Sequence, residues 1–312
     1  ANVPKDDPAF DDNQSIFPGT LYNYGIKISN EFGYSAEGAD IGFTIPNGKI
    51  AGSVFTPGPT VGAPWSPPGN PVADVEVSLS PVRGKSVHLD GLNDYISVKS
   101  DFATATADAF TFEFWYYIDP PAENATIIDW GDRLRIYQTS SMLQAEIAGF
   151  IVQDALPATE TWNHVAVVYD GSYLKLYQNA TIRDSIGYTN VLPAASELRF
   201  GKNRLNTEFF AGNLDDIRLW QVAITMEQIE RNDARALFGD EPDLLGYWKF
   251  DENQDVLSFD MSEPRENAEL MGGTVWSDNF AAIQLSAYTD EQGEYEIRGV
   301  WYDASTENGT QY

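Results

Sequence analysis

The hexapeptide FTFEFW at residues 110–115 is the clearest indicator of the fold class of this chain. Its phenylalanines alternate with threonine, glutamate and tryptophan at a period of two, the pattern of a β-strand that has one face in a core. Similar short stretches recur along the chain, and Gly, Asn, Asp or Pro bounds each of them. The further predicted strands include residues 21–28, 75–79, 164–169, 174–177, 217–220 and 295–300. Many short strands separated by turns indicate an all-β protein built of sandwiches.

Two segments lie outside this pattern. Thr225 can cap a helix over residues 226–238, which has acidic side chains near its start and Gly239 at its end. Residues 57–71 are rich in Pro and Gly and predict an exposed loop, which contains Trp65. One helix is therefore expected in an otherwise β-rich chain.

The composition limits the classes of partner. Of the 312 residues, 43% are hydrophobic, which is enough for a sizeable core. The 19 Lys and Arg against 47 Asp and Glu give a net charge of −28, which disfavours nucleic acid and anionic membranes as partners. No run of 18 apolar residues is present, so no membrane insertion is expected. The absence of cysteine excludes disulfides, thiolate nucleophiles, zinc fingers and iron–sulfur clusters.

The central part of the chain carries a series of motifs in a fixed order. They are SVHLDGLNDYISV at 86–98, FTFEFW at 110–115, TWNHVAVVYDG at 161–171, LKLYQN at 174–179, LRFG at 198–201, FAGNLDDIRLW at 210–220 and LGYWKFDE at 245–252. In this order and spacing they resemble a laminin-G-like, concanavalin-A-like jelly roll. One departure is QNA at 178–180, where that family often has an Asn-Gly turn.

Two weaker resemblances flank the central part. GKIAGSV at 48–54 and NPVADVEV at 70–77 resemble the first strands of a carboxypeptidase-regulatory-like (prealbumin-like) sandwich, and TDEQGEYEIRGV at 289–300 resembles its later hairpin. Because these pieces lie about 200 residues apart, they indicate a domain inserted into a domain, which exposed loop tips tolerate. YNYGIKISNEFGYS at 22–35 is similar to the last hairpin of a fibronectin-type-III-like domain.

The resemblances imply an all-β chain in which a concanavalin-A-like jelly-roll sandwich is inserted into a smaller prealbumin-like β-sandwich. The predicted domains are 1–46, a fibronectin-type-III-like remnant; 47–83 and 279–312, the two parts of the prealbumin-like sandwich; and 84–278, the laminin-G-like jelly roll. Both ends are expected to be interior points of a longer, multidomain chain. The arrangement resembles segments of large bacterial (Bacteroidetes-type) surface adhesins.

The motifs of catalysis are missing from the sequence. Some jelly rolls of this kind are glucanases with Glu-x-Asp-x-x-Glu on one strand, which places two carboxylates in the groove. Here Glu113 stands alone between two phenylalanines, and neither histidine lies in a nucleophile-elbow motif. His164 is predicted to be a structural strand residue and His88 to face solvent. We therefore expect a protein that is not an enzyme.

Acidic residues in the first and last jelly-roll motifs suggest calcium. Calcium takes six to eight oxygen ligands, usually from tight loops. The laminin-G-like resemblance implies that these motifs lie near each other and hold a structural calcium ion. The candidate metal ligands are Asp90, Asp94, Asp215, Asp216 and Asp251, of which Asp90 and Asp215 are favoured. The alternative is that these side chains cap turns or are solvated.

Polar loops that contain an aromatic residue are candidates for ligand binding. A glycan site combines an exposed aromatic ring with side chains that bond hydroxyl groups. The candidates are Trp130, Asp132, Arg133, Asn203 and Arg204, in loops with turn character. Trp115, Trp162, Trp220 and Trp248 lie in strand motifs and are expected in the core.

These observations predict a non-catalytic segment of a secreted, extracellular cell-surface adhesin. Its jelly roll would act in cell adhesion by binding a glycan or a cell-surface protein, next to neighbouring domains of the same chain. One alternative is a purely structural spacer. Another is a carbohydrate-binding appendage of a polysaccharide-degrading enzyme. An open concave face with exposed aromatic residues would favour glycan binding, and a face covered by loops would favour the spacer.

Overall fold

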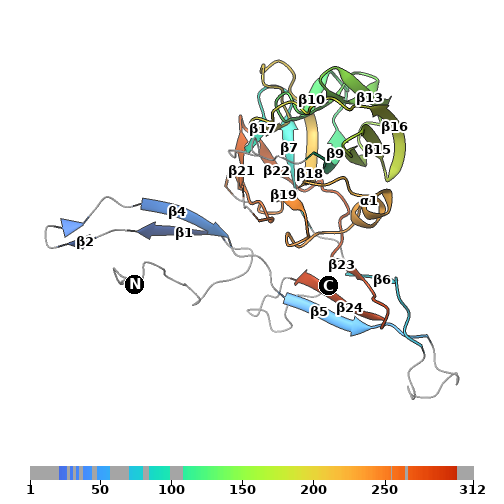
Figure 1. The fold of residues 1–312 in the computed structure, drawn as a ribbon. Coiled ribbons are helices and arrows are strands. Elements are labelled where there is room, and N and C mark those ends of the chain that lie inside the picture. The colour runs from blue at the N-terminus through green and yellow to red at the C-terminus, as the bar shows by residue number, and fades with distance from the viewer. Residues whose placement is uncertain are drawn as a thin grey trace. The chain divides into compact units, whose positions relative to one another are not determined.

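The chain divides into two units in the computed structural model, and each is treated by itself (Figure 1). The central unit spans residues 79–286, and the second unit is formed from residues 1–78 and 287–312. The residues that the structure describes are 21–26, 29–30, 33–34, 38–43, 48–56, 70–79, 84–98, 108–253, 255–263 and 266–300. The predicted loop at 57–71, with Trp65, lies almost entirely outside them.

Two antiparallel sheets make up most of the central unit. The front sheet contains β8 (Tyr95–Val98), β10 (Ala125–Asp129), β11 (Arg135–Gln138), β12 (Met142–Ile147), β13 (Phe150–Ala155), β17 (Leu198–Phe200), β20 (Leu257–Ser258) and β21 (Ala268–Met271). Its strand order is β13-β12-β11-β10-β17-β8-β21-β20. Strands β10 to β13 follow one another along the chain, whereas β17, β8 and β21 come from distant parts of the sequence, as expected of a jelly roll.

The back sheet lies on the other side of the core. It contains β7 (Ser86–Asp90), β9 (Phe110–Ile118), β14 (Trp162–Tyr169), β15 (Tyr173–Gln178), β16 (Thr181–Gly187), β18 (Ala211–Trp220), β19 (Leu244–Trp248) and β22 (Val275–Ser277). The order is β16-β15-β14-β9-β18-β7-β22, and β19 pairs with β18. Strands β9 and β14 pair over their full predicted lengths and beyond them.

The alternation in β9 supplies both faces of the back sheet. Phe112 and Phe114 are fully buried in the core between the two sheets. Thr111 and Glu113, which have the opposite parity, point to the outer face of the back sheet, where they too are buried. The back sheet is therefore covered on both sides at β9, and the strand motif that identifies the fold lies near the centre of this sheet.

One helix covers part of this outer face. Helix α1 (Met226–Asn232) begins with a capping box in which Thr225 and Gln228 exchange side-chain and backbone hydrogen bonds. Its residue Ile229 packs in a second apolar cluster against side chains of β14, β15, β18 and β19. The helix predicted over residues 226–238 is present, but it ends at Asn232, so the predicted end point was wrong.

The helix ends early because distant side chains take the carbonyl groups that follow it. Arg218 on β18 donates from Nη1 to the Asn232 carbonyl oxygen at 2.7 Å and from Nη2 to that of Arg235 at 2.6 Å. Trp115 on β9 donates from Nε1 to the Asp233 carbonyl oxygen at 2.6 Å. These hydrogen bonds hold residues 232–235 against the back sheet in place of further helical turns.

A polar network lies buried under this cover. Glu113 accepts a hydrogen bond from Trp220 Nε1 at 2.8 Å, and its other carboxylate oxygen, 3.8 Å from His164 Nε2, has no hydrogen-bond donor among the described residues. Burial raises the pKa of Glu113 to about 7 and lowers the pKa of His164 to about 3. His164 is a buried strand residue, as predicted, and burial favours its neutral form; its Nδ1 lacks the hydrogen bond expected of a core histidine among the described residues.

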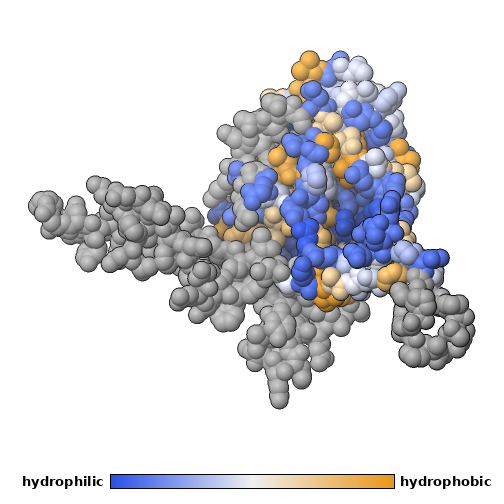
Figure 2. All heavy atoms as spheres, turned by 60° about the horizontal axis from the view of Figure 1, so that its bottom comes forward, coloured by the Kyte–Doolittle hydropathy of each residue, from blue (hydrophilic) through white to orange (hydrophobic). Residues whose placement is uncertain are grey.

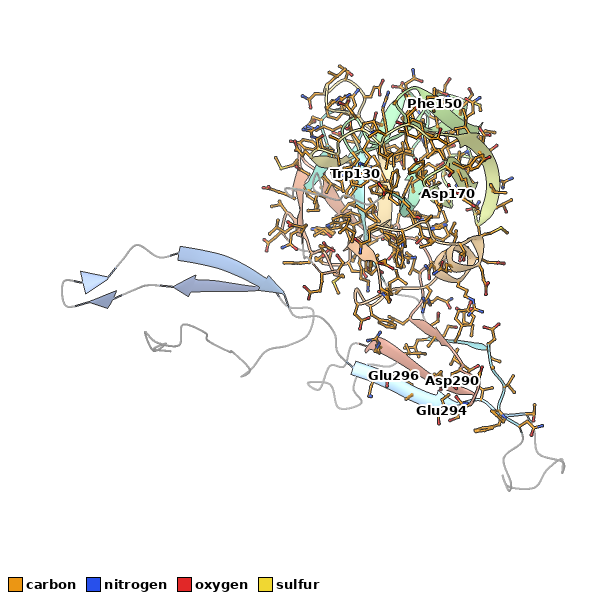
Figure 3. The ribbon with its side chains drawn as sticks, viewed as in Figure 1. Trp130, Phe150, Asp170, Asp290, Glu294 and Glu296 are labelled. Carbon is orange, nitrogen blue, oxygen red and sulfur yellow. The ribbon has the colours of Figure 1, made fainter. Side chains whose placement is uncertain are left out.

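The second unit contains short antiparallel pairs formed by segments far apart in the sequence. β5 (Gly48–Ser53) pairs with β24 (Glu294–Val300), and β6 (Glu76–Ser78) pairs with β23 (Ser286–Tyr288). Asp290 closes the turn before β24 by accepting the backbone N–H groups of residues 292 and 294 (Figure 3). The chain therefore leaves this unit after β6 and returns to it at β23.

Closer to the N-terminus, two further strand pairs are present. β1 (Leu21–Ile26) pairs with β4 (Gly38–Phe43), and β2 (Ser29–Asn30) pairs with β3 (Gly33–Tyr34). The assignment of these segments to a fibronectin-type-III-like domain, and of β5, β6, β23 and β24 to a prealbumin-like sandwich, stays a prediction.

The described surface is mostly polar. Hydrophilic residues dominate the coloured part of the face in Figure 2, and hydrophobic residues occur there in scattered groups. None of the helices in the described part of the chain has the length and apolar character needed to cross a membrane.

We predict that Gly212→Ala destabilises the central unit far more than Gly149→Ala. Gly212 lies inside β18 with φ +143°, and an added Cβ would lie 2.0 Å from the carbonyl oxygen of Tyr117. Gly149 also has a positive φ, +86°, but nothing lies within 4 Å of its added Cβ. Backbone strain costs about 1–2 kcal/mol at both positions, and the clash adds about 1–3 kcal/mol at Gly212. Urea denaturation measures both losses, and equal losses would contradict the packing described for β18.

A second prediction concerns pH. Because the folded state favours the protonated form of Glu113, its contribution to stability is complete below the ordinary pKa of 4.5 and is lost as the pH rises to about 7. The change is on the order of 3 kcal/mol. The stability of wild type relative to Glu113→Gln should therefore fall between pH 4.5 and 7.5. The exposed Glu230→Gln is the matched control, and a pH-independent difference for Glu113→Gln would refute the prediction.

Candidate functional site

An open pocket of about 390 Å³ lies at one end of the front sheet. Its lining comes from three strand ends and from four connecting segments. The lining residues are Asp129, Gly131, Asp132, Arg135, Glu146, Ala148, Pro193, Asn203, Arg204 and Leu205. Strands and turns of a rigid sandwich thus carry a concave site.

The floor of the pocket is one row of side chains across three strands. In the sheet register, Asp129 of β10 lies opposite Arg135 of β11, and Arg135 lies opposite Glu146 of β12. Directly opposed residues of antiparallel strands project from the same face. The three charged side chains therefore alternate in sign along the row, about 4.8 Å from strand to strand.

Two of these floor residues are held by neighbouring groups. Asp129 Oδ1 accepts the Gly131 N–H and Asp129 Oδ2 accepts the Arg204 N–H, both at 2.9 Å. Its carboxylate thus ties the turn after β10 to the loop after β17. Arg135 donates to Thr126 Oγ1 at 3.1 Å and forms an ion pair with Glu208.

The loop after β17 forms one wall and is organised by its own side chains. Asn203 accepts the Thr207 N–H at 3.0 Å and donates from Nδ2 to Thr207 Oγ1 at 2.9 Å. These bonds close the loop and leave Leu205 at the pocket rim with 73% of its surface exposed. The wall is therefore pre-formed, and its most exposed side chain is apolar.

A tight turn and a hydrogen-bonded proline form two other parts of the lining. Ala148, with φ +49°, and Gly149, with φ +86°, connect β12 to β13. The carbonyl oxygen of Pro193 accepts a hydrogen bond from Arg133 Nε at 3.1 Å. Both segments add apolar surface to the pocket.

The polar groups most accessible in the pocket are an ion pair. Arg204 Nη1 lies 2.5 Å from Asp132 Oδ1, and these side chains are 51% and 67% exposed. A guanidinium group supplies several N–H donors in a fixed plane, and a carboxylate supplies acceptors. Beside the apolar Leu205, this pair can donate to and accept from neighbouring hydroxyl groups of a ligand.

The structure places three of the five predicted ligand residues in this pocket: Asp132, Asn203 and Arg204. The prediction of an exposed Trp130 was wrong, because it is only 1% exposed and packs edge-on against Phe110 and Phe112 (Figure 3). The turn at residues 130–134 points the indole into the core.

Arg133 is also placed differently from the prediction. Its guanidinium lies over the Trp130 ring, 5.1 Å from the centroid, and the residue is 7% exposed. It supports the Pro193 wall and offers little surface to a ligand. The prediction also missed floor residues Asp129, Arg135 and Glu146. The alternation of polar and apolar residues in each strand could have predicted that these side chains point outward. Only the pairing register of the strands shows that they lie side by side.

The five predicted calcium ligands do not form one site. Asp90 lies opposite Ala211 in the β7–β18 pair, four residues before Asp215, so roughly 13 Å separates the two positions along the strand. Asp94 accepts the backbone N–H of Asp90 at 3.0 Å. Among the described residues, no three His, Asp or Glu side chains gather in a metal-binding arrangement.

The buried acids of the last motif already have protein partners. Asp216 accepts from the Tyr247 hydroxyl at 2.6 Å and pairs with Arg218, and Asp215 Oδ2 accepts the Ala281 N–H at 2.9 Å. Burial, followed by repulsion from Asp251, raises the pKa of Asp215 well above its ordinary value. This donor set does not fit a single calcium ion.

The four tryptophans predicted to lie in the core, and His88, differ in solvent exposure. Trp220 and Trp248 are buried as expected, whereas Trp115 and Trp162 are partly exposed. His88 is partly exposed, and its Nε2 lies 2.8 Å from Asp119 Oδ2.

Comparison with known proteins agrees with the sandwich. Residues 90–230 match the family model Laminin_G_3, described as concanavalin A-like lectin/glucanases superfamily. No curated protein matches the chain in sequence. Among solved structures, a candidate carbohydrate-binding protein from Bacteroides ovatus is similar at 18% identity and a TM-score of 0.53, over 86% of this chain and 73% of that one.

Two other solved structures are less similar. The receptor-binding domain of botulinum neurotoxin C/D mosaic serotype has 14% identity and a TM-score of 0.40, over 51% of this chain and 45% of that one. The CBM40 of Ruminococcus gnavus IT-sialidase, bound to α2,3-sialyllactose, has 13% identity and a TM-score of 0.39, over 51% and 98%. The two packed sheets and the family match together identify the central unit as a concanavalin A-like, all-β sandwich.

Proposed function

We propose that the central unit is a non-catalytic glycan-binding module and that the pocket on the front sheet is its binding site. The observation that carries the proposal is the accessible Arg204–Asp132 pair beside exposed Leu205, on walls fixed by hydrogen bonds. Sugars present hydroxyl groups around an apolar ring face, so they match a site with planar donors, carboxylate acceptors and adjacent apolar surface.

The fold supports this choice. The family match covers lectins as well as glucanases, and the similar protein from Bacteroides ovatus is a candidate for carbohydrate binding. Glu113, the acid that sequence analysis considered for catalysis, lies buried beneath the cover of the back sheet and away from the pocket lining. Recognition without turnover is therefore the function we assign to the pocket.

The wider setting is also a proposal. We place the chain outside the cell, as a segment of a multidomain surface adhesin whose partner is a glycan, free or on a cell-surface protein. The net charge of −28 favours solubility and suits contact with uncharged partners. The structural calcium ion expected from the sequence stays a prediction, and none of its five candidate ligands lines the pocket.

We predict that Arg204→Ala and Asp132→Ala each weaken glycan binding by about tenfold or more, since a hydrogen bond to a charged group contributes about 1.5–3 kcal/mol. A glycan array identifies ligands, and calorimetry with and without calcium measures their affinity. Arg231→Ala, on α1 and outside the pocket lining, is the matched control.

Three results would contradict the proposal. The first is an absence of binding to every glycan on a broad array of host, plant and microbial glycans. The second is equal loss of affinity in the Arg231→Ala control. The third is turnover of a bound glycan that disappears in Glu146→Gln or Asp132→Asn, since paired pocket carboxylates would then act in hydrolysis.

A further inference from the structure

Beyond the pocket, the outer surface of β11, β12 and β13 carries a strip of uncharged side chains. The strip consists of the outward residues Tyr137, Met142, Gln144, Ile151 and Gln153. The buried residues of the same strands alternate with them, so the strip belongs to the outer face. All five side chains are uncharged, whereas the neighbouring pocket floor carries Asp129, Arg135 and Glu146.

The strip continues directly from the pocket floor. Tyr137 lies opposite Gln144, and Gln144 lies opposite Gln153, so these three form the row next to the one that contains Arg135 and Glu146. Two residues along a strand separate adjacent rows on one face, which is about 7 Å. A ligand that fills the pocket can therefore extend onto the strip without crossing a loop.

The amide groups of the strip are positioned for hydroxyl groups. Gln144 Nε2 donates to Gln153 Oε1 at 2.7 Å, which orients both side chains. Among the described residues, no other protein group bonds the Gln144 amide oxygen or the Gln153 amide nitrogen. One acceptor and one donor thus lie side by side on the open face, next to the Tyr137 ring that the Arg135 guanidinium supports from 4.1 Å.

The charges of the pocket indicate which ligands would be rejected. Three carboxylates, of Asp129, Asp132 and Glu146, line it against two guanidinium groups. Both guanidinium groups already have carboxylate partners, Glu208 for Arg135 and Asp132 for Arg204. A uronic or sialic acid carries a negative charge, so the pocket carboxylates and the net negative charge of the chain would repel it.

We infer that the pocket and the uncharged strip together bind one uncharged glycan chain, with one sugar unit in the pocket and the following units over Tyr137, Gln144 and Gln153. This inference rests on the proposed function and adds the ligand's charge and its minimum length. The strip contributes bonds that a single sugar in the pocket cannot reach, so affinity depends on chain length.

The test compares length and charge in one series. Neutral gluco-, manno- and xylo-oligosaccharides of one to six units, and oligogalacturonides of the same lengths, are titrated against wild type, Gln144→Ala and Gln221→Ala. Gln221 is an exposed glutamine of the same unit outside both surfaces, which makes it the matched control. Thermal melting of each variant verifies that it is folded.

The expected result has three parts. For a neutral series, affinity rises by about tenfold between one unit and three and then levels off, as two added neutral hydrogen bonds would give. Gln144→Ala removes most of that rise and leaves the affinity for the single sugar unchanged, while Gln221→Ala changes neither. The acidic oligomers bind more weakly than neutral oligomers at every length.

Failure of the inference is distinguishable from failure of the proposed function. Binding that is independent of length, tighter for oligogalacturonides, or weakened equally for all lengths by Gln144→Ala overturns the inference and leaves glycan binding intact. No binding of any member of the series, together with no binding on the glycan array, overturns both.

Discussion

The organisation of the central unit depends on the burial of both faces of β9. Phe112 and Phe114 enter the core between the sheets, and Glu113 on the opposite face is buried beneath the segment that contains α1. The Trp220 indole bonds one oxygen of this acid, and burial outweighs the nearby Arg218 and favours its protonated form. This arrangement covers the outer face of the back sheet around β9, whereas the pocket lies on the front sheet and its connecting loops.

On the front sheet, the Asp129 carboxylate has a comparable organising role. Each of its oxygens accepts a backbone N–H from a different loop, so one buried side chain positions both the turn with Asp132 and the loop with Arg204. Binding residues placed by such bonds lose little conformational entropy when a ligand arrives. The most exposed polar groups of the pocket thus depend on a residue that offers no free oxygen to the ligand.

Sequence reasoning reached the fold class because alternation and motif order are local properties, and the family match agrees with them. It identified Asp132, Asn203 and Arg204 because loop composition is local as well. It failed where contacts between distant parts of the chain determine the structure. These contacts bury Trp130, end α1 through the hydrogen bonds of Arg218, and place Arg135 opposite Glu146. The strand register also places Asp90 opposite Ala211, four residues before Asp215, a separation that the sequence does not show.

An open, polar pocket has a consequence for affinity. Hydroxyl groups exchange bonds with water for bonds with protein, so each contact contributes only about 0.5–1.5 kcal/mol net unless a charged group takes part. Leu205 at the rim adds apolar contact on one side of the ligand, and the strip adds further weak bonds along it. Under the proposed function, a single unit of this design would bind a glycan chain weakly and release it quickly. Strong attachment would then require several units on one long chain or surface, where effective concentration multiplies weak contacts, and the proposed multidomain setting would meet this requirement.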